Sequence, residues 1–232
     1  MQAIILAGGK GTRLKPYTIT LPKPLVPVGE RPVLEIIIDQ LKMQGFNKIT
    51  LAVGHLSELI QAYFGDGKKF GVQIKYSKEE KPLGTAGPIK LIKNLDDNFL
   101  VMNSDDLTDF DYREFLDLHI KSEAVITIAS YKKQVKVDLG VLVAENDLLT
   151  DYIEKPVYDF SVSMGIYAFK KEALNFIPED EYFDFPTLIK RLISEGKKVK
   201  CIPHSGYWLD IGRPEDYEKA NDDIQNLGFS AK

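Results

Sequence analysis

Apolar positions in the first half of the chain alternate between short continuous runs and helical repeats. Residues 3–7 are apolar throughout, which predicts a strand over residues 2–7 that is covered on both faces of a sheet. In residues 33–45 the apolar side chains recur at offsets of 0, 3, 4 and 7, so this segment predicts an amphipathic helix that stops at Gly45. The same reasoning predicts strands at 48–53, 72–77 and 98–103 and helices at 57–64, 85–95 and 111–120. This β-α order favours a parallel sheet with right-handed crossovers.

The second half has a different pattern, with more strands and fewer helices. Strands are predicted at 124–131, 137–145, 149–155, 162–169 and 199–203, and helices at 185–196 and 214–227. Strands that follow one another without helices between them are typical of antiparallel pairing. We therefore expect one α/β domain over residues 1–232. Its fold would be a Rossmann-like three-layer sandwich with a mostly parallel mixed sheet and additional antiparallel strands in the second half.

Composition narrows the class of protein. The 232 residues are 44% hydrophobic and 28% charged, as in ordinary globular proteins, and a chain of this length buries about 70% of its surface on folding. A net charge of -4 argues against nucleic acid as a partner. No run approaches the roughly 18 apolar residues of a membrane span. Cys201 is the only cysteine, which excludes an internal disulfide and favours a cytoplasmic location.

The first strand leads into the segment LAGGKGTRLKPYTITLPKPLVPVG, residues 6–29. Its first three glycines allow the backbone to pass close to a ligand and to turn amide N–H groups toward a phosphate. Arg13 and Lys23 add cationic groups that suit phosphate oxygens. The prolines forbid a helix directly after the strand, so we expect a long, stiff loop over the carboxyl edge of the sheet.

Two familiar phosphate motifs are absent from this loop. A P-loop requires lysine after its second conserved glycine, and here Gly11 is followed by Thr12. A dinucleotide fingerprint requires glycine where this chain has Leu14. A nicotinamide-dependent dehydrogenase is therefore the weakest of the alternatives.

The strand predicted at 98–103 ends just before two adjacent carboxylates, Asp105 and Asp106. Carboxylates at the end of a buried strand, beside a phosphate loop, are good ligands for Mg²⁺. Adjacent aspartates after a strand are also common in turns and helix caps. Asp106 and Asp109 are left mostly to the turn or cap. Of the remaining residues, His119 is expected in the core and Trp208 in packing.

Further motifs follow along the chain: PLGTAG at 82–87, NSDD at 103–106, EKP at 154–156, GIY at 165–167 and WLDIG at 208–212. Together with the segment 6–29, they resemble in kind and order the motifs of the sugar-1-phosphate nucleotidyltransferases. The resemblance covers essentially the whole chain. It implies a Mg²⁺-dependent transfer of a nucleotidyl group from a nucleoside triphosphate (NTP) to a sugar 1-phosphate, with pyrophosphate released.

The resemblance also implies roles for individual residues. Residues 1–123 would form a nucleotide-binding half and 124–232 a sugar-phosphate-binding half. The implied nucleotide-binding residues are Leu6, Ala7, Gly8, Gly9, Gly11, Thr12, Pro82, Gly84 and Thr85; the cations of the reaction are Arg13, Lys23 and Lys155; the sugar-binding residues are Asn103, Gly140, Glu154 and Gly165; and the metal ligands are Asp105 and Asp210.

Alternatives remain within and beyond this family. The segment PLGTAGPIKL most resembles the guanylyltransferases, which favours GTP, with dTTP- or UTP-dependent transfer to glucose 1-phosphate as the alternative. Ser104 stands where the family usually has glycine, and Met164 adds bulk near the expected sugar pocket. Ser104 motivates a second reading, a non-catalytic regulatory protein that binds nucleotide sugars. We expect a bare catalytic core, and because relatives are often dimers or tetramers, a homo-oligomer is compatible with it.

Overall fold

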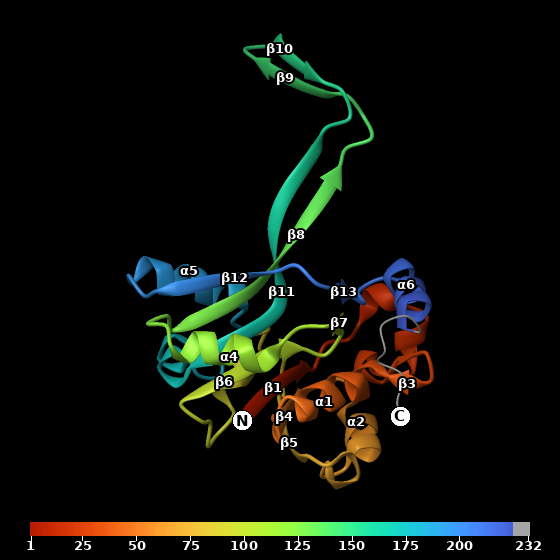
Figure 1. Ribbon diagram of the computed structural model, residues 1–232, viewed down its shortest axis with the longest axis vertical. Helices are drawn as coiled ribbons and strands as arrows, with labels where there is room; N and C mark the ends of the chain where they lie inside the picture. The colour runs from red at the N-terminus through yellow and green to blue at the C-terminus, as the bar shows by residue number, and fades with distance from the viewer. Residues whose placement is uncertain (225–232) are drawn as a thin grey trace.

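A seven-stranded mixed sheet forms the centre of the computed structural model, which describes residues 1–224. The strand order is β12-β8-β11-β6-β1-β4-β5 (Figure 1). The bounds are β1 Gln2–Ala7, β4 Lys48–Val53, β5 Gln73–Lys78, β6 Asn98–Asn103, β8 Ile126–Lys136, β11 Val157–Lys170 and β12 Val199–His204. β1 is parallel to β4 and β6, whereas β11 is antiparallel to both of its neighbours. The predicted mixed sheet is confirmed.

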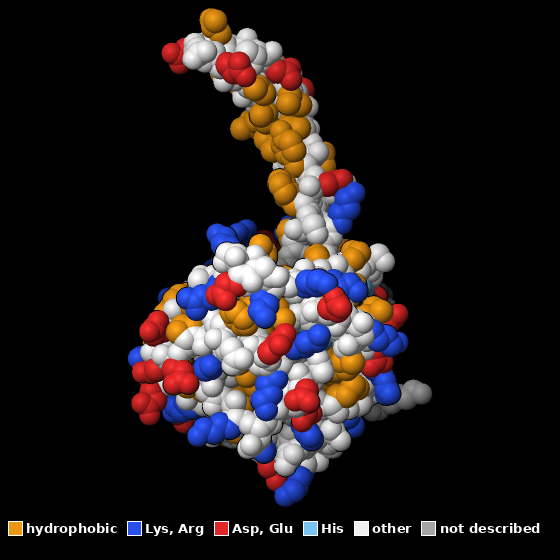
Figure 2. Space-filling view, turned by 90° about the vertical axis from the view of Figure 1, so that its left-hand side faces the viewer, with side chains coloured by type: hydrophobic (Ala, Val, Ile, Leu, Met, Phe, Trp, Pro, Cys, Tyr) orange, Lys and Arg blue, Asp and Glu red, His pale blue; other side chains and the backbone are white. Residues whose placement is uncertain are grey.

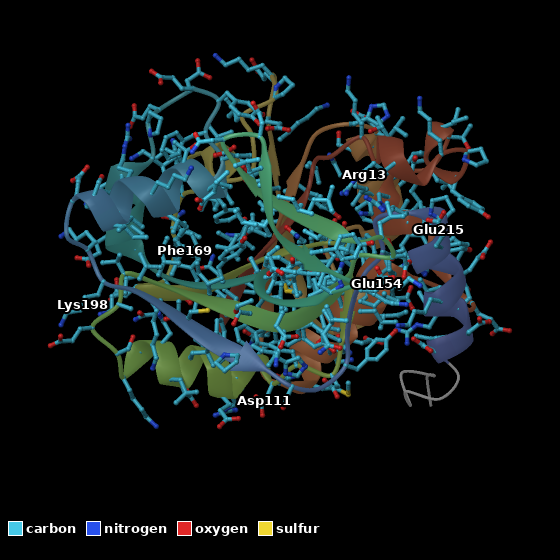
Figure 3. All side chains as sticks on the ribbon, turned by 90° about the horizontal axis from the view of Figure 1, so that it is seen from above. Arg13, Asp111, Glu154, Phe169, Lys198 and Glu215 are labelled. Carbon is cyan, nitrogen blue, oxygen red and sulfur yellow. The ribbon has the colours of Figure 1, made fainter. Side chains whose placement is uncertain are left out.

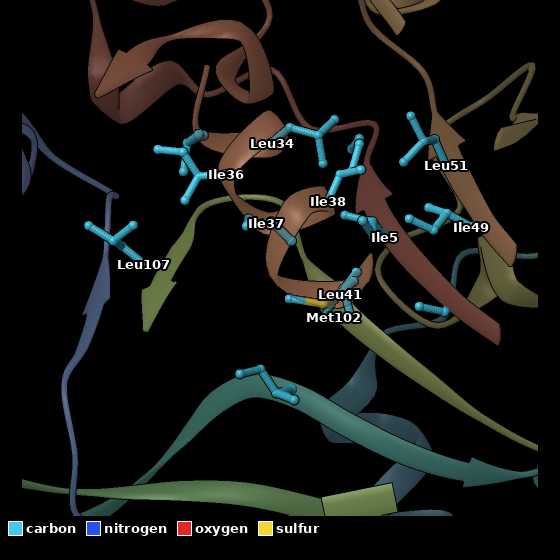
Figure 4. Close-up of a cluster of buried hydrophobic side chains, with 14 of the residues drawn as sticks. Ile5, Leu34, Ile36, Ile37, Ile38, Leu41, Ile49, Leu51, Met102 and Leu107 are labelled. Atoms are coloured by element: carbon cyan, nitrogen blue, oxygen red, sulfur yellow. The ribbon is translucent and has the colours of Figure 1, made fainter. Parts of the chain in front are cut away.

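Helices cover both faces of this sheet: α1 Val33–Met43, α2 Ser57–Phe64, α3 Gly87–Lys90, α4 Tyr112–Ile120, α5 Phe185–Ser194 and α6 Pro214–Ile224. Because successive side chains of a strand point to opposite faces of the sheet, the hydrophobic core forms two layers, one on each face. Ile5 of β1 faces α1, α2 and α4, whereas the adjacent Ile4 faces α3 and α5. Figure 4 shows the first of these layers, where Leu34 and Leu41 of α1 pack near Ile5. His119 is fully buried, as the sequence predicted.

One predicted helix is much shorter in the structure, and the end of another falls on residues that the structure does not describe. The helix expected over 85–95 is a single turn, α3, because the chain then turns through Asn94 with a φ of 60° before entering β6. The helix expected over 214–227 is α6, and residues 225–227 lie outside the described residues. The proline-rich loop is confirmed as an irregular segment with three short 3-10 turns, Thr12–Leu14, Tyr17–Ile19 and Lys23–Leu25.

Three small two-stranded sheets complete the fold. They pair β2 Pro27–Val28 with β3 Arg31–Pro32, β7 Asp106–Thr108 with β13 Trp208–Asp210, and β9 Val141–Glu145 with β10 Leu148–Ile153. The sequence predicted β9 and β10 as strands but did not predict β7 or β13.

A long arm, residues 131–163, projects from the rest of the molecule, which we call the body. In it β8 and β11 continue beyond the body and carry β9 and β10 at the tip (Figures 1 and 2). The buried hydrophobic core has no member within the arm. Within residues 1–224, no helix combines the length and apolarity that a membrane span requires.

Candidate active site

A cleft of about 900 Å³ opens at the carboxyl ends of β1, β4, β5 and β6. Parallel strands all end at this edge, which is where open α/β sheets bind ligands. Thirteen of the predicted site residues line it: Leu6, Ala7, Gly8, Gly9, Gly11, Thr12, Arg13, Lys23, Pro82, Gly84, Thr85, Asn103 and Asp105. Segments far apart in sequence thus meet in one cavity.

The glycine loop forms one wall of the cleft. Gly11 has a φ of 60°, a conformation that favours glycine, and its carbonyl accepts a hydrogen bond from Thr18 Oγ1 at 2.7 Å. Leu14 is fully buried and anchors the loop to the body. The neighbouring Arg13 is exposed along the cleft, and a Cβ at Gly9 would meet no atom within 4 Å. The loop is therefore fixed to the body by Leu14, and its other side is accessible to a ligand in the cleft.

The opposite wall is the segment 82–87, which is fixed to the chain around Phe183. The carbonyl of Phe183 accepts hydrogen bonds from the N–H groups of Ala86 and Gly87 at 3.0 and 2.9 Å. Gly84 has a φ of 80°, and a Cβ there would lie 2.6 Å from the same carbonyl oxygen. Only glycine allows this close approach, so the structure gives Gly84 a physical role in shaping the wall.

Glu79 is a cleft residue that the sequence reasoning missed. It follows β5 directly, and its Oε2 accepts a hydrogen bond from the N–H of Leu83 at 3.0 Å. Its position after a parallel strand, at the edge where the other predicted residues lie, was the available signal.

An acidic cluster closes one end of the cleft. The β7–β13 pairing places Asp210 opposite Asp106, and the N–H of Ile211 donates to the carbonyl of Asp105 at 3.0 Å. Asp105, Asp106 and Asp210 each present a carboxylate oxygen within 4.8 Å of the others. Two aspartates 105 positions apart, predicted as metal ligands, therefore lie together.

Lys23 is the cation nearest to this cluster among the described ion pairs. Its Nζ pairs with the carboxylate of Asp105 and lies 3.9 Å from Oδ1 of Asp210. Burial, and next the charge of Asp105, raise the pKa of Asp210, although Lys23 and Arg13 act in the opposite direction.

Asp106 is more than a turn residue. It is fully buried, its Oδ1 accepts a hydrogen bond from Trp208 Nε1 at 3.0 Å, and its Oδ2 has no partner. Burial, and then the charges of Asp105 and Asp210, raise its pKa well above the usual value. Trp208, expected only to pack, therefore also orients this carboxylate.

The three carboxylates suit a hard divalent cation. Mg²⁺ and Ca²⁺ take oxygen ligands, and the unpaired Oδ2 of Asp106 is the kind of orphaned buried acceptor that a cation would satisfy. The donor set fits a divalent metal, and the chemistry alone does not choose among such metals.

Gly165 lies beside this cluster. Its φ is 75°, and a Cβ there would come within 2.2 Å of Asn103 Nδ2 and 3.0 Å of Asp106 Oδ2. Two predicted sugar-binding residues, Asn103 and Gly165, are therefore adjacent. The side chain of Met164 is buried in the core.

Of the five predicted residues that do not line the cleft, Asp210 and Gly165 lie at the acidic cluster beside it, and three lie away from both. Gly140, Glu154 and Lys155 lie on the arm, and the side chains of Glu154 and Lys155 are 60% and 58% exposed. Figure 3 looks onto the body from the side of the arm and marks Arg13 and Glu154. Lys155 has a φ of 46°, a conformation that costs a non-glycine residue on the order of 1 kcal/mol and that is common at functional sites.

Comparison with known proteins gives consistent matches. A model of the family described as nucleotidyl transferase matches residues 2–226. The UTP–glucose-1-phosphate uridylyltransferase of Synechocystis sp. is 36% identical over 241 residues, covering 95% of this chain and 62% of that protein. The mannose-1-phosphate guanyltransferase of Candida albicans is 36% identical over 231 residues, covering 94% and 62%. The chain thus spans 62% of the length of these curated relatives.

Solved structures share the fold. HddC from Yersinia pseudotuberculosis superimposes with a TM-score of 0.75 and 28% identity, covering 96% of this chain and 99% of that one. The same protein complexed with GMP-PN gives a TM-score of 0.71 and 27% identity, with the same coverage.

Proposed function

Because the chain belongs to the nucleotidyl transferase family, we propose that it transfers a nucleotidyl group from an NTP to a sugar 1-phosphate. The observation that carries the proposal is the cleft itself. It joins a glycine loop with Arg13 and Lys23 to the carboxylates of Asp105 and Asp210. Such an arrangement holds polyphosphate at one end and a divalent cation at the other.

In the proposed reaction an oxygen of the sugar 1-phosphate attacks the α-phosphorus of the NTP in line. A new P–O bond forms as the bond from the α-phosphorus to the β-phosphoryl oxygen breaks, and pyrophosphate leaves with that electron pair. Backbone amides of the glycine loop and Arg13 hold the triphosphate. Lys23 lies near the reacting phosphorus, and Lys155 holds the incoming phosphate. Positioning and fixed charge supply the rate enhancement, without a covalent intermediate.

Asp105 and Asp210 are the residues that would hold the metal, which we propose is Mg²⁺, with Asp106 beside them. When bound, a divalent cation neutralises charge on the phosphate oxygens.

We propose GTP as the favoured nucleotide. The segment 82–91 resembles that of guanylyltransferases, one relative is named a mannose-1-phosphate guanyltransferase, and a similar solved structure is a complex with GMP-PN. Because another relative is named a uridylyltransferase, UTP remains the alternative nucleotide, together with dTTP.

In the proposed function, residues 1–123 bind the nucleotide and residues 124–232 bind the sugar phosphate. For the sugar we propose Asn103 from the first half and Gly140, Glu154 and Gly165 from the second half as binding residues, in a cytoplasmic reaction.

The test is pyrophosphate release with Mg²⁺, using five nucleotides (GTP, UTP, dTTP, CTP and ATP) against the 1-phosphates of mannose, glucose and N-acetylglucosamine. We expect release in the GTP column that depends on the sugar phosphate. Arg13→Ala and Asp105→Asn should each lower turnover at least about 100-fold, the usual cost of losing a preorganised charge. Asp117→Asn, on the exposed face of α4, is the control and should leave turnover unchanged.

Other outcomes separate the alternatives. Pyrophosphate release with UTP or dTTP would change the proposed nucleotide substrate and would leave the proposed reaction class unchanged. If no combination releases pyrophosphate but nucleotide binding is retained, the result would point either to a different acceptor or to the non-catalytic regulatory protein that Ser104 motivates. Absence of nucleotide binding would contradict both functions.

A further inference from the structure

The arm is an amphipathic ribbon. Residues directly opposite each other in an antiparallel pair project from the same face. Tyr158 pairs with Val135, and Phe160 lies two positions along on the same face. The opposite face is polar, where Asp159 forms an ion pair with Lys132 at 2.9 Å. The ribbon therefore has one face built to be covered and one built for water.

The apolar face is uncovered in the single chain. Figure 2 shows hydrophobic side chains gathered along one side of the arm. More than half of the large hydrophobic side chains that the described residues expose lie on the arm. Val135, Tyr158 and Phe160 share the apolar face, and the others lie on either face of the ribbon or at its tip: Leu139, Leu142, Val143, Leu148, Leu149, Tyr152, Ile153 and Val157. Half-exposed side chains of this size present on the order of 1,000 Å², comparable with the roughly 800 Å² that each partner buries in a stable complex.

A ribbon of two strands is at best marginally stable when it stands alone in water. The arm therefore needs a covering surface. Its own body is a poor candidate, because β8 and β11 pair on both sides of a register shift, from Val157–Lys136 to Ser163–Ser130 in the arm and from Tyr167–Ile128 to Phe169–Ile126 in the body. Folding the arm back onto its body would require a sharp bend at this shift. The surface available to every arm without such a bend is another copy of the chain.

The arm also carries what the cleft lacks. Under the proposed function, Lys155 and Glu154 contact the sugar phosphate, yet both project into solvent beyond the body. The exposed side chains of Tyr17, Ile19 and Leu21 offer an apolar landing surface on the loop that holds Arg13 and Lys23. An arm that docked there would bring its cation to the acidic end of the cleft.

We propose that two copies of the chain exchange arms, so that each arm packs on the partner body and brings Lys155 to the partner's cleft. The exchange explains the uncovered face and the distance of Lys155 from its own cleft. The contribution of Lys155 to the reaction rests on the proposed function, whereas the exchange itself does not.

The exchange is tested first by sedimentation of the full chain, independently of activity. We expect a dimer at micromolar concentration. Phe160→Glu, on the apolar face, should shift it to monomer, whereas Ser161→Glu, the adjacent residue on the polar face, should leave it dimeric. A monomeric wild-type chain, or a Phe160→Glu variant that stays dimeric, would overturn the proposal.

Cross-linking then shows where the arm lies. An equal mixture of ¹⁵N-labelled and unlabelled chains is co-refolded and treated with a carbodiimide, which joins a lysine to a neighbouring carboxylate. We expect Lys155 linked to a cleft carboxylate such as Glu79, with the two peptides in mixed isotopic pairs. Links only within one isotope, or none to the cleft, would contradict exchange even if the protein proves inactive in every assay.

Where the wild type is active, complementation adds a functional readout. Lys155→Ala and Asp105→Asn chains, each inactive alone, are co-refolded in equal amounts. In an exchanged dimer one of the two sites of each mixed pair is intact, so activity should recover to about one quarter of wild type. No recovery would show that each arm serves its own body and would exclude the exchange, while leaving the proposed reaction intact.

Discussion

Trp208, the single tryptophan of the chain, reports directly on the acidic cluster. Its Nε1 donates to Asp106, whose other carboxylate oxygen is buried without a partner. A cation bound among Asp105, Asp106 and Asp210 would change the field at the indole ring. We therefore expect Mg²⁺ to alter the tryptophan emission of the metal-free protein in a saturable way.

The same titration assigns the ligands. Asp210→Asn removes one charge from the cluster and should weaken Mg²⁺ at least about 10-fold, because charged oxygens dominate the binding of hard cations. Asp117→Asn should titrate as the wild type does. An unchanged titration in Asp210→Asn would show that the cation binds elsewhere.

His119 gives a second prediction at the residue scale. It is fully buried, its Nδ1 lies 2.8 Å from Thr127 Oγ1, and its Nε2 has no partner. Burial, and next the charge of Lys170, lower the pKa of His119 to about 4 from its ordinary 6.5. Between these values the unfolded chain binds more protons than the folded one, so the stability from this group is present above about pH 6.5 and lost as pH falls toward 4.

The measurement is urea unfolding at pH 4.5, 5.5 and 7. We expect the free energy of unfolding of the wild type to fall with acidification by on the order of 1–3 kcal/mol more than that of His119→Asn, which keeps a polar atom for Thr127 but does not titrate. Parallel pH dependences would show that His119 is readily protonated in the folded protein.

At the scale of elements, Gly165 joins β11 to the site. The β8–β11 register shifts between Ser163 and Tyr167, and Gly165 occupies this shift with a φ of 75° against Asn103. Gly196 also has a positive φ, of 70°, but a Cβ there would meet no atom within 4 Å. Alanine at Gly196 would therefore introduce backbone strain alone, whereas alanine at Gly165 would introduce both backbone strain and a steric clash.

We expect Gly196→Ala to cost about 1 kcal/mol of unfolding free energy, the price of a left-handed alanine. Gly165→Ala should cost at least about 2 kcal/mol more, because its Cβ would overlap the amide of Asn103. Chemical denaturation of the two variants measures the difference. Equal losses would mean that Asn103 moves aside freely.

Elements with a strong period could be predicted from the sequence, and those defined by long-range pairing could not. Residues 2–7 and 57–64 form β1 and α2 with the predicted bounds, since each has a clear apolar pattern. The strands β7 and β13 are three residues each and exist because they pair across about 100 positions. No local pattern marks such short strands, so the role of Asp106 beside the metal ligands was missed.

At the scale of the molecule, the predicted site residues fall into two groups, those that lie in or beside the cleft and those that lie on the arm. The thirteen predicted residues that line the cleft lie at the ends of body strands or in loops tied to them, and the convergence of parallel strands at one edge brings them together. Gly140, Glu154 and Lys155 lie in the connections between strands of the arm, and their position depends on how far the β8–β11 ladder continues. Alternating apolar residues predict a strand but not the surface that covers it, and here the single chain offers none.

Because the core has no member in the arm, body and arm should be separable in stability. Lys136 and Val157 are cross-strand partners, so residues 137–156 can be replaced by Asn-Gly, which closes a two-residue hairpin. We expect the shortened chain to unfold cooperatively, within about 1 kcal/mol of the Phe160→Glu monomer, because the same two body cores remain. It should bind nucleotide but fail to release pyrophosphate when a sugar phosphate is added. Denaturation and nucleotide titration of both variants measure this, and a shortened chain that turns over normally would remove the arm from the site.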